Sequence, residues 1–359
     1  MSALDLAFNQ HRQGQFAEAE AGYRALLADN PNDVDVLHVL GLLRHQRGDA
    51  GEALTLITRA HELAPDNATI EYTRGNLLME HGDRAAASVA FTRTLVLDPN
   101  FTGAHIGLGQ MALDRGDFEA AEQHFRIALR AGPDDPHALA GMGAVRLQHN
   151  DAEGALRYLT RAAEQLPDHA MLQFMLGQAF SAREMLDFAE QALGNALRLK
   201  PDLHLARRWL ASVYLRQNRP EDAAVLYRAL LPVPGFAVVA QIGFADVARM
   251  QERPADAVVH YREALAQAPA LSLATRALGM VLANLGRNDE VIEAYSHYLA
   301  HVPDDADMRV LRADVLMLLE RWSEAAADWQ YLVERNPQDA NARARLAEAQ
   351  AKLAASPTQ

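Results

Sequence analysis

The feature that most constrains this chain is a proline that returns every 34 residues. Nine of the ten positions on this register hold proline, and the tenth is Gly235, directly after Pro234. Because a proline stops one helix and lets the next begin, the pattern predicts a row of helix pairs that each contact only their neighbours. The nine prolines are Pro31, Pro65, Pro99, Pro133, Pro167, Pro201, Pro269, Pro303 and Pro337.

Small and bulky residues keep the same phase as the prolines. A small residue stands 24 positions before each closing position, a second one stands 12 before, and a bulky apolar residue follows that second one by four. We expect the two small residues to face each other where two helices cross, because a larger side chain would push the backbones apart. The first set is Ala7, Gly41, Gly75, Gly109, Gly143, Gly177, Ala211, Ala245, Gly279 and Ala313. The second set is Ala19, Ala53, Ala87, Ala121, Ala155, Ala189, Ala223, Ala257, Val291 and Ala325, and the bulky set is Tyr23, Ile57, Phe91, Phe125, Leu159, Leu193, Tyr227, Tyr261, Tyr295 and Trp329.

A turn is predicted between the two helices of each pair. Glycine or asparagine fills the turn position in seven pairs, and both residue types accept a positive φ after a helix end. Glu184, Glu252 and Glu320 fill it elsewhere, so we expect those three turns to be less left-handed or slightly strained. Pro220 and Pro254 follow two of the turns and are expected at the first position of a helix. The glycine and asparagine turns are Gly14, Gly48, Gly82, Gly116, Asn150, Asn218 and Gly286.

This combination of a small residue, A-x-x-x-aromatic and proline at a period of 34 resembles the tetratricopeptide repeat (TPR) signature. The resemblance covers residues 1 to about 354. It implies an all-α fold, a right-handed α-solenoid of ten helix-turn-helix repeats in a single array, with a polar capping helix at its end. The predicted repeats are 1–33, 34–67, 68–101, 102–135, 136–169, 170–203, 204–237, 238–271, 272–305 and 306–339, followed by the capping helix at 340–354 and a tail at 355–359.

The seventh predicted repeat is the least regular. Its closing segment, residues 230–236, carries two prolines and shifts the turn. We expect either a local change of superhelical pitch or a loop variant without further effect.

Composition excludes several classes of protein. The absence of cysteine excludes disulfides, thiolate metal sites and cysteine catalysis. A formal net charge of −13 argues against nucleic acid as a partner. No apolar run approaches the ~18 residues of a membrane span, and no basic region followed by an apolar run opens the chain, so we expect a soluble, cytoplasmic protein without membrane insertion.

Apparent active-site motifs are explained by the repeat. Residues 107–112 resemble a dinucleotide fingerprint, but Gly109 is the small repeat position inside a predicted helix. The pairs His297/His301 and His38/His45 lack a carboxylate at ligand spacing. We therefore predict no catalytic residues, no cofactor and no metal, and the chain is not expected to be an enzyme.

The resemblance implies that first helices line a concave groove, with positions 2, 5, 9, 12 and 13 of each repeat facing it. These positions predict a groove with an apolar middle followed by a section that bears arginines. The candidate peptide-binding residues are Tyr72, Asn76, Ile106, Leu147, Met171, Phe174, Gln178, Arg208, Arg216, Arg249, Met250 and Arg276.

The four arginines in this set have two interpretations. The guanidinium fork suits carboxylates, which predicts an acidic peptide as the ligand. However, all but Lys200 and Lys352 of the 34 basic residues are arginine, so any helical face collects some of them. The alternative is solvated arginines that pair with neighbouring acidic side chains.

Subtypes of the family can be tested on the same positions. The clamp of TPR co-chaperones is absent, since only Asn76 matches one of its positions. The opening residues 14–20 also resemble TPR arrays that precede glycosyltransferase or sulfotransferase domains in bacteria, although no such domain follows and the asparagine ladder of the sugar-transferase arrays is absent.

These observations predict a non-catalytic scaffold or adaptor that binds a peptide or helix of a partner protein in its concave groove. One alternative is a targeting subunit that acts in trans with a separate glycosyltransferase or sulfotransferase. Another is an assembly factor whose end repeats make the contacts, including contacts that build a homo-oligomer.

Overall fold

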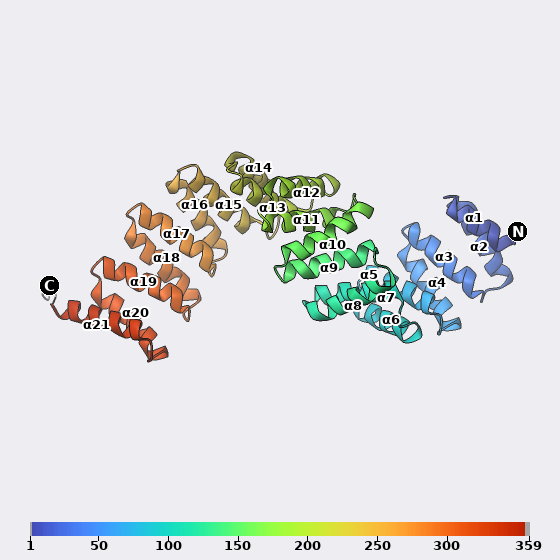
Figure 1. Cartoon of the computed structure of the whole chain (residues 1–359), viewed down its shortest axis with the longest axis horizontal. Coiled ribbons are helices and arrows are strands. Elements are labelled where there is room, and N and C mark those ends of the chain that lie inside the picture. Colours follow the sequence, from blue (N-terminus) through green and yellow to red (C-terminus); the bar gives the residue numbers. More distant parts are fainter. Residues whose placement is uncertain (1, 356–359) are drawn as a thin grey trace. The chain divides into compact units, whose positions relative to one another are not determined.

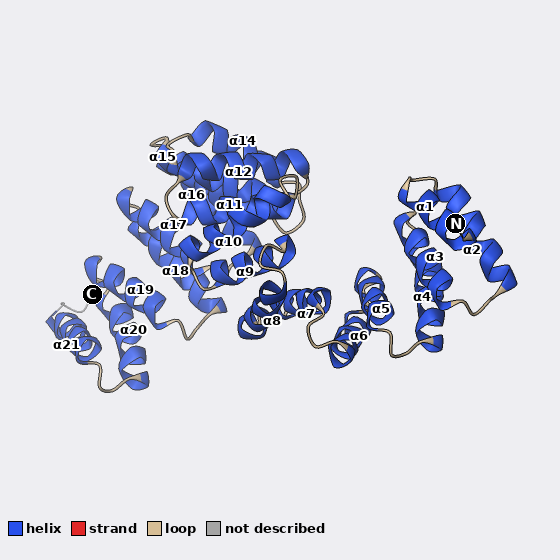
Figure 2. Ribbon diagram, turned by 45° about the vertical axis from the view of Figure 1, so that its right-hand side comes forward, coloured by secondary structure: helices blue, strands red, loops and turns tan. Residues whose placement is uncertain are grey.

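The computed structural model describes residues 2–355, and these contain helices and no strand (Figures 1 and 2). The all-α prediction is therefore confirmed. The predicted tail at 356–359 lies outside the described residues. The chain divides into two compact units, Met1–Arg183 and Glu184–Gln359, called unit 1 and unit 2 below. This division falls inside the predicted repeat 170–203.

Unit 1 contains five helix pairs and one further helix. In each pair the helix before the turn is called the first helix and the one after it the second, and the two pack against each other. The helices are α1 (Ala3–Arg12), α2 (Phe16–Asp29), α3 (Val34–Gln46), α4 (Ala50–Leu63), α5 (Ala68–Glu80), α6 (Arg84–Leu97), α7 (Thr102–Asp114), α8 (Phe118–Ala131), α9 (Pro136–Gln148), α10 (Ala152–Gln165) and α11 (Ala170–Ala182).

Unit 2 begins with a second helix, continues with four pairs and ends with a single helix that packs against α20. Pro220 and Pro254 open α14 and α16 as predicted. The helices are α12 (Leu186–Leu199), α13 (His204–Arg216), α14 (Pro220–Leu230), α15 (Ala237–Met250), α16 (Pro254–Gln267), α17 (Ser272–Asn284), α18 (Asn288–His301), α19 (Ala306–Leu318), α20 (Trp322–Arg335) and α21 (Ala340–Ala355).

The glycines at the small repeat position lie closest to the bulky repeat residue, and the alanine expected to face them is a more distant neighbour. A methyl group on Gly75 would lie 2.6 Å from the ring of Phe91, and one on Gly107 would lie 2.8 Å from the same ring. Phe125 lies in the same way between Gly109 and Gly141. The bulky side chain projects further than the alanine methyl, so it reaches both first helices that flank it, and glycine leaves the space for it.

All ten turns between first and second helices are left-handed. The glycine and asparagine turns have positive φ, as predicted. Glu184, Glu252 and Glu320 have φ of 59°, 55° and 56°, so the expectation of less left-handed turns there is wrong. The helix pair imposes the turn on whichever residue stands there, at a cost of about 1–2 kcal/mol for a residue with a Cβ.

The two units start their second helices differently. In unit 1, an aspartate precedes each of α4, α6, α8 and α10, and its carboxylate accepts the backbone N–H three residues later at 2.8–3.1 Å. In unit 2, an arginine stands at this position before α14, α16, α18 and α20 and pairs with a carboxylate three residues later. The aspartates are Asp49, Asp83, Asp117 and Asp151, and the arginines are Arg219, Arg253, Arg287 and Arg321.

The irregular closing segment of the seventh repeat shortens one helix. The helix α14 has 11 residues and ends at Leu230, whereas α12 and α16 have 14 each. Gly235 then takes a φ of 81° just before α15 begins. The double proline is the reason, since neither Pro232 nor Pro234 can donate a backbone hydrogen bond to continue the helix. A change of pitch at this point stays a prediction.

Candidate functional site

A groove of about 820 Å³ lies along unit 1. Almost all of its lining comes from α3, α5, α7, α9 and α11, and we call it the first-helix groove. Its apolar lining is Leu42, Tyr72, Leu77, Met79, Phe91, Ile106, Gly107, Leu113, Phe118, Ala140, Gly141, Ala144, Met171 and Met175. Its polar lining is His45, Thr73, Asn76, Glu80, Gln110, Asp114, His137, Gln148 and His169.

Tyr72 is held in place at the floor of this groove. Its ring lies 4.9 Å from that of Phe101 and 5.9 Å from that of Phe91, measured between ring centres. Gly103 provides the space, because a methyl group there would lie 2.5 Å from the tyrosine ring. The packed rings fix the orientation of Tyr72, so this part of the floor is a rigid apolar surface.

The groove carries little uncompensated charge. No lysine or arginine lines it among the described residues. Of its two carboxylates, Glu80 lies 2.5 Å from Nε2 of His45, and Asp114 lies 2.7 Å from the guanidinium of Arg84, which is outside the groove. Both carboxylates are therefore already occupied by neighbours, and the remaining surface favours an apolar or uncharged ligand.

Three histidines, His45, His137 and His169, also line the groove. His45 makes the contact with Glu80, and Nδ1 of His169 accepts the backbone N–H of Leu172 at 3.2 Å, which caps α11. His137 lies near the start of α9. Among the described residues, no group of three or more histidine, aspartate and glutamate side chains could hold a metal ion.

Four of the predicted site residues in unit 1 line the groove, namely Tyr72, Asn76, Ile106 and Met171. The other three do not line it. Phe174 is only 6% exposed, and Leu147 and Gln178 are half-buried.

Several lining residues were not among the candidates. Gln110 and His137 occupy positions 9 and 2 of their repeats, so the position rule could have found them. Phe118 and His169 come from outside the first helices, and no repeat position signals them.

Three of the four predicted arginines in unit 2 already have acidic partners. Arg216 lies 2.5 Å from Glu184, Arg249 lies 3.1 Å from Asp246, and Arg276 lies 3.2 Å from Asp307. Arg249 also donates to the hydroxyl of Tyr261 at 3.4 Å, and burial raises the pKa of that hydroxyl to about 12.

Arg208 is exposed and has no ion pair among the described residues. Met250 is 38% exposed. These contacts support the interpretation of the arginines as surface ion pairs, since most of their charge is already compensated.

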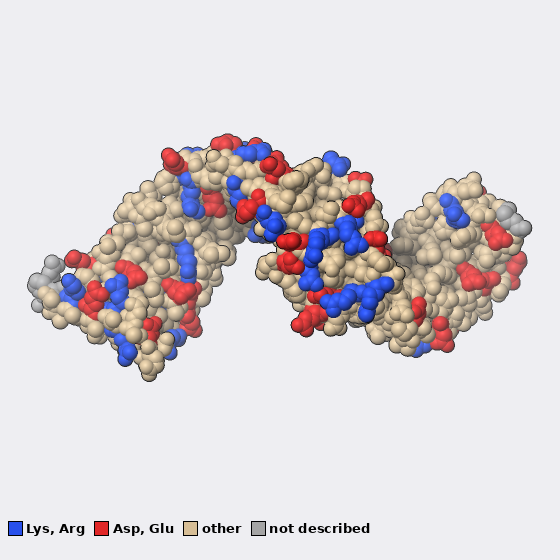
Figure 3. Space-filling model, in the orientation of Figure 1, with Lys and Arg blue, Asp and Glu red and all other residues tan. Residues whose placement is uncertain are grey.

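Basic side chains also gather over α8 to α10 in unit 1, bordered by acidic ones on the face in view (Figure 3). Arg126 and Arg146 both contact Glu122, at 2.5 and 2.6 Å, and Arg161 lies 2.6 Å from Asp134. This surface is a mixture of both signs, whereas nucleic acid binding needs a continuous basic stripe. None of the described helices is long and apolar enough to cross a membrane.

A model of the tetratricopeptide repeat family matches residues 5–68, 72–136, 141–185, 182–235, 242–306 and 277–339. A search of curated proteins finds no match. Among solved structures, the chain is similar to Pseudomonas aeruginosa pilF, with 18% identity over 58% of this chain and 96% of that chain and a TM-score of 0.52.

A monomeric mutant of IFIT1 solved with Gppp-AAAA is 15% identical over 90% of this chain and 78% of that one, with a TM-score of 0.53. A tetratricopeptide repeat protein from Parabacteroides merdae is 17% identical over 68% and 97%, with a TM-score of 0.49. At these identities the structural likeness shows the fold alone. The family model covers most of the chain, and the chain therefore belongs to the tetratricopeptide repeat family, whose helix pairs form a scaffold for protein interactions.

Proposed function

We propose that the first-helix groove binds an apolar segment of a partner protein, as an extended peptide or as one face of a helix, and that the chain is a non-catalytic adaptor. The observation that carries this proposal is the lining of the groove, which comes almost entirely from five first helices and includes no lysine or arginine among the described residues. The two carboxylates of the lining already have partners in His45 and Arg84, so apolar side chains can bind the apolar part of the lining without leaving a new charge unpaired.

The methionines suit a ligand of varied shape. Met79, Met171 and Met175 line the groove, and Met171 is 43% exposed. An unbranched thioether can adjust its rotamer to different apolar partners. Tyr72, by contrast, is fixed and would define the orientation of the segment. The ligand we propose is therefore apolar rather than acidic.

The proposal can be tested with peptides from a random display library selected against the full chain. Their affinities would be measured by fluorescence anisotropy for the native chain and for a Leu42→Glu/Met171→Glu double variant. These two side chains are 38% and 43% exposed, so the fold should tolerate the change. We expect affinity to fall by about tenfold or more, because two carboxylates would have to be desolvated on binding.

The matched control is Val96→Glu, which adds a carboxylate at a side chain on α6 that is 67% exposed and outside the groove. Its affinity for the peptides should equal that of the native chain. Peptides that bind the double variant as tightly as the native chain would place the binding site elsewhere and end the proposal.

A further inference from the structure

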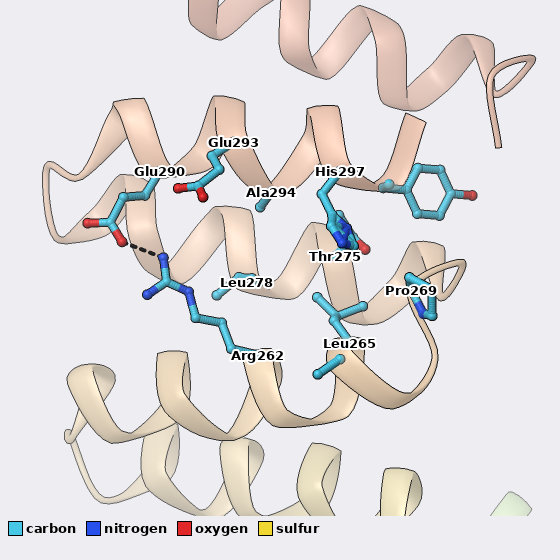
Figure 4. A pocket seen from close by; sticks show the side chains of 11 residues that line it. Arg262, Leu265, Pro269, Thr275, Leu278, Glu290, Glu293, Ala294 and His297 are labelled. Atoms are coloured by element: carbon cyan, nitrogen blue, oxygen red, sulfur yellow. Dashed lines mark hydrogen bonds and ion pairs between the residues drawn. The ribbon is translucent and has the colours of Figure 1, made fainter. Parts of the chain in front are cut away.

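A second cavity, of about 470 Å³, lies in unit 2 between the second helices α16 and α18, with α17 as its floor (Figure 4). We call it the α16–α18 cleft. Leu265 of α16, Leu278 of α17 and Ala294 of α18 provide an apolar interior. It lies between second helices, so it is independent of the first-helix groove.

One side of the rim is already neutralised. The guanidinium of Arg262 lies 2.5 Å from Glu290, and Arg287 donates two hydrogen bonds to the same carboxylate at 2.6 and 2.7 Å. These bonds, first those of Arg287 and then that of Arg262, lower the pKa of Glu290 to about 2. Glu290 is therefore ionised and fully occupied by two cations.

The other side of the rim is open. Glu293 and His297 lie one turn apart on α18 above the apolar interior, and both are exposed (Figure 4). Glu293 has no hydrogen bond or ion pair with any described residue. The ring of His297 is stacked on that of His301, with 5.0 Å between their centres and 26° between their planes. The unpaired carboxylate of Glu293 thus lies one turn from the imidazole ring of His297, whose orientation is fixed by His301.

We infer that the α16–α18 cleft binds an arginine side chain of a partner protein. The aliphatic part of the arginine would pack on Leu265 and Leu278, and its guanidinium would reach Glu293 and cover the ring of His297. The charges agree, because Arg262 and Arg287 neutralise Glu290, which leaves Glu293 as the carboxylate of the described lining without a basic partner.

The neighbouring cleft provides an internal comparison. A cavity of about 600 Å³ between α14 and α16 is lined by Arg228, Arg253 and the carboxylate Glu221, and Arg253 is already paired with Asp256 at 3.2 Å. The residues that precede Glu293 by one and two periods are Val259 and Val225. The carboxylate at 293 is therefore not part of the repeat pattern, and it distinguishes the α16–α18 cleft from its neighbour.

The test uses two small probes on the full chain, a blocked arginine (N-acetyl-arginine N-methylamide) and its neutral isostere, blocked citrulline. Binding would be followed by the NMR methyl signals of Leu265 and Leu278. We expect both signals to shift with the arginine probe and its affinity to exceed that of citrulline by about three- to fivefold, as befits one partly exposed ion pair.

The variant Glu293→Gln should abolish this preference for arginine. The matched control is Glu263→Gln, which removes the same charge from α16 outside the cleft lining and should leave the preference unchanged. Equal affinities for the two probes, or an arginine preference that survives Glu293→Gln, would overturn the inference. Dimers of the chain that the arginine probe dissociates would overturn it as well, because the occupant would then be a second copy.

Discussion

Four second helices in each unit begin with opposite charges at the same repeat position, an aspartate before α4, α6, α8 and α10 and an arginine before α14, α16, α18 and α20. Asp117 in unit 1 caps α8 by accepting the backbone N–H of Ala120 at 3.1 Å. Arg253 in unit 2 makes no such bond and instead lies 3.2 Å from Asp256. In both units a carboxylate lies in the first turn, where the helix dipole favours negative charge. One repeat geometry therefore accepts two local solutions, a direct backbone cap and a surface ion pair.

Unit 2 also holds a buried carboxylate with two arginine partners. Asp328 is 2% exposed and accepts hydrogen bonds from Arg309 at 3.0 Å and from Arg312 at 2.6 and 2.8 Å. We expect Asp328→Asn to lower the free energy of unfolding by about 3 kcal/mol, because two guanidinium groups would lose their counter-charge. Hydrogen exchange should accelerate first in α19 and α20, and equal acceleration in unit 1 would contradict the local character of the repeats.

The two caps should differ in stability and in their response to salt. Asp117→Ala should cost about 1 kcal/mol, because the N–H of Ala120 would lose its acceptor. Arg253→Ala should cost less, about 0.5 kcal/mol or below, because both members of its ion pair are about half exposed. Urea titrations at low salt and in 1 M NaCl would check this, since salt should weaken the ion pair more than the backbone hydrogen bond of the aspartate. A larger loss for the arginine variant would reverse the comparison.

A fall in pH should lower the stability of unit 1 through two histidines, His38 and His124. Burial lowers the pKa of His38 and, together with the charges of His105 and Arg115, that of His124. As the pH falls, the unfolded chain therefore takes up protons at these two rings before the folded chain does. Stability is therefore full above pH ~6.5 and falls as the pH drops below that value. Hydrogen exchange of α3 and α8 should accelerate between pH 7.5 and 5.5, and His124→Gln should reduce the effect at α8. An unchanged pH dependence in that variant would exclude His124 as a cause.

The smallest expected effect concerns the left-handed glutamates. Glu252 has a φ of 55°, and Glu252→Gly should raise the free energy of unfolding by about 0.5 kcal/mol, because relief of strain exceeds the extra freedom that glycine gives to the unfolded chain. The matched variant in unit 1 is Asn150→Gly. Its free energy of unfolding should rise by less, because asparagine tolerates this conformation better than glutamate does. Thermal melting would detect the difference, and a loss of stability on Glu252→Gly would show that the glutamate turn is not strained.

The repeat made the all-α fold and the family predictable from the sequence. Period and phase are properties of the chain itself, so the helices and the positive φ of Gly82 or Asn218 could be anticipated. The partner of each small residue could not. Whether Gly75 meets Ala87 or Phe91 depends on the distance and angle at which the helices cross, and the sequence pattern holds both candidates.

The candidate site was predictable only in part. Tyr72 and Met171 lie on the groove-facing side of their helices, and the position rule selects that side. Ion pairing is a different matter, because Arg276 meets Asp307 across 31 residues of sequence and no local pattern signals this contact. The α16–α18 cleft could not be found either, since the space between two second helices depends on side-chain volumes from three helices.

Phe91 and Phe125 each lie between glycines of two neighbouring helix pairs, and these contacts decide where the chain can be divided into repeats. Phe91 completes a contact with Gly75 in its own helix pair and another with Gly107 in the next, and Phe125 does the same with Gly109 and Gly141, so each of these rings has a second glycine in the following pair. A 34-residue deletion or duplication preserves such a contact only where the new junction again brings a ring and a glycine together, because the repeat position of Gly107 holds Thr73 one period earlier and Met175 two periods later. A transplanted foreign repeat keeps them only if its own first helix supplies the glycine. The interchangeable module is therefore defined by the junction between neighbours rather than by the helix pair.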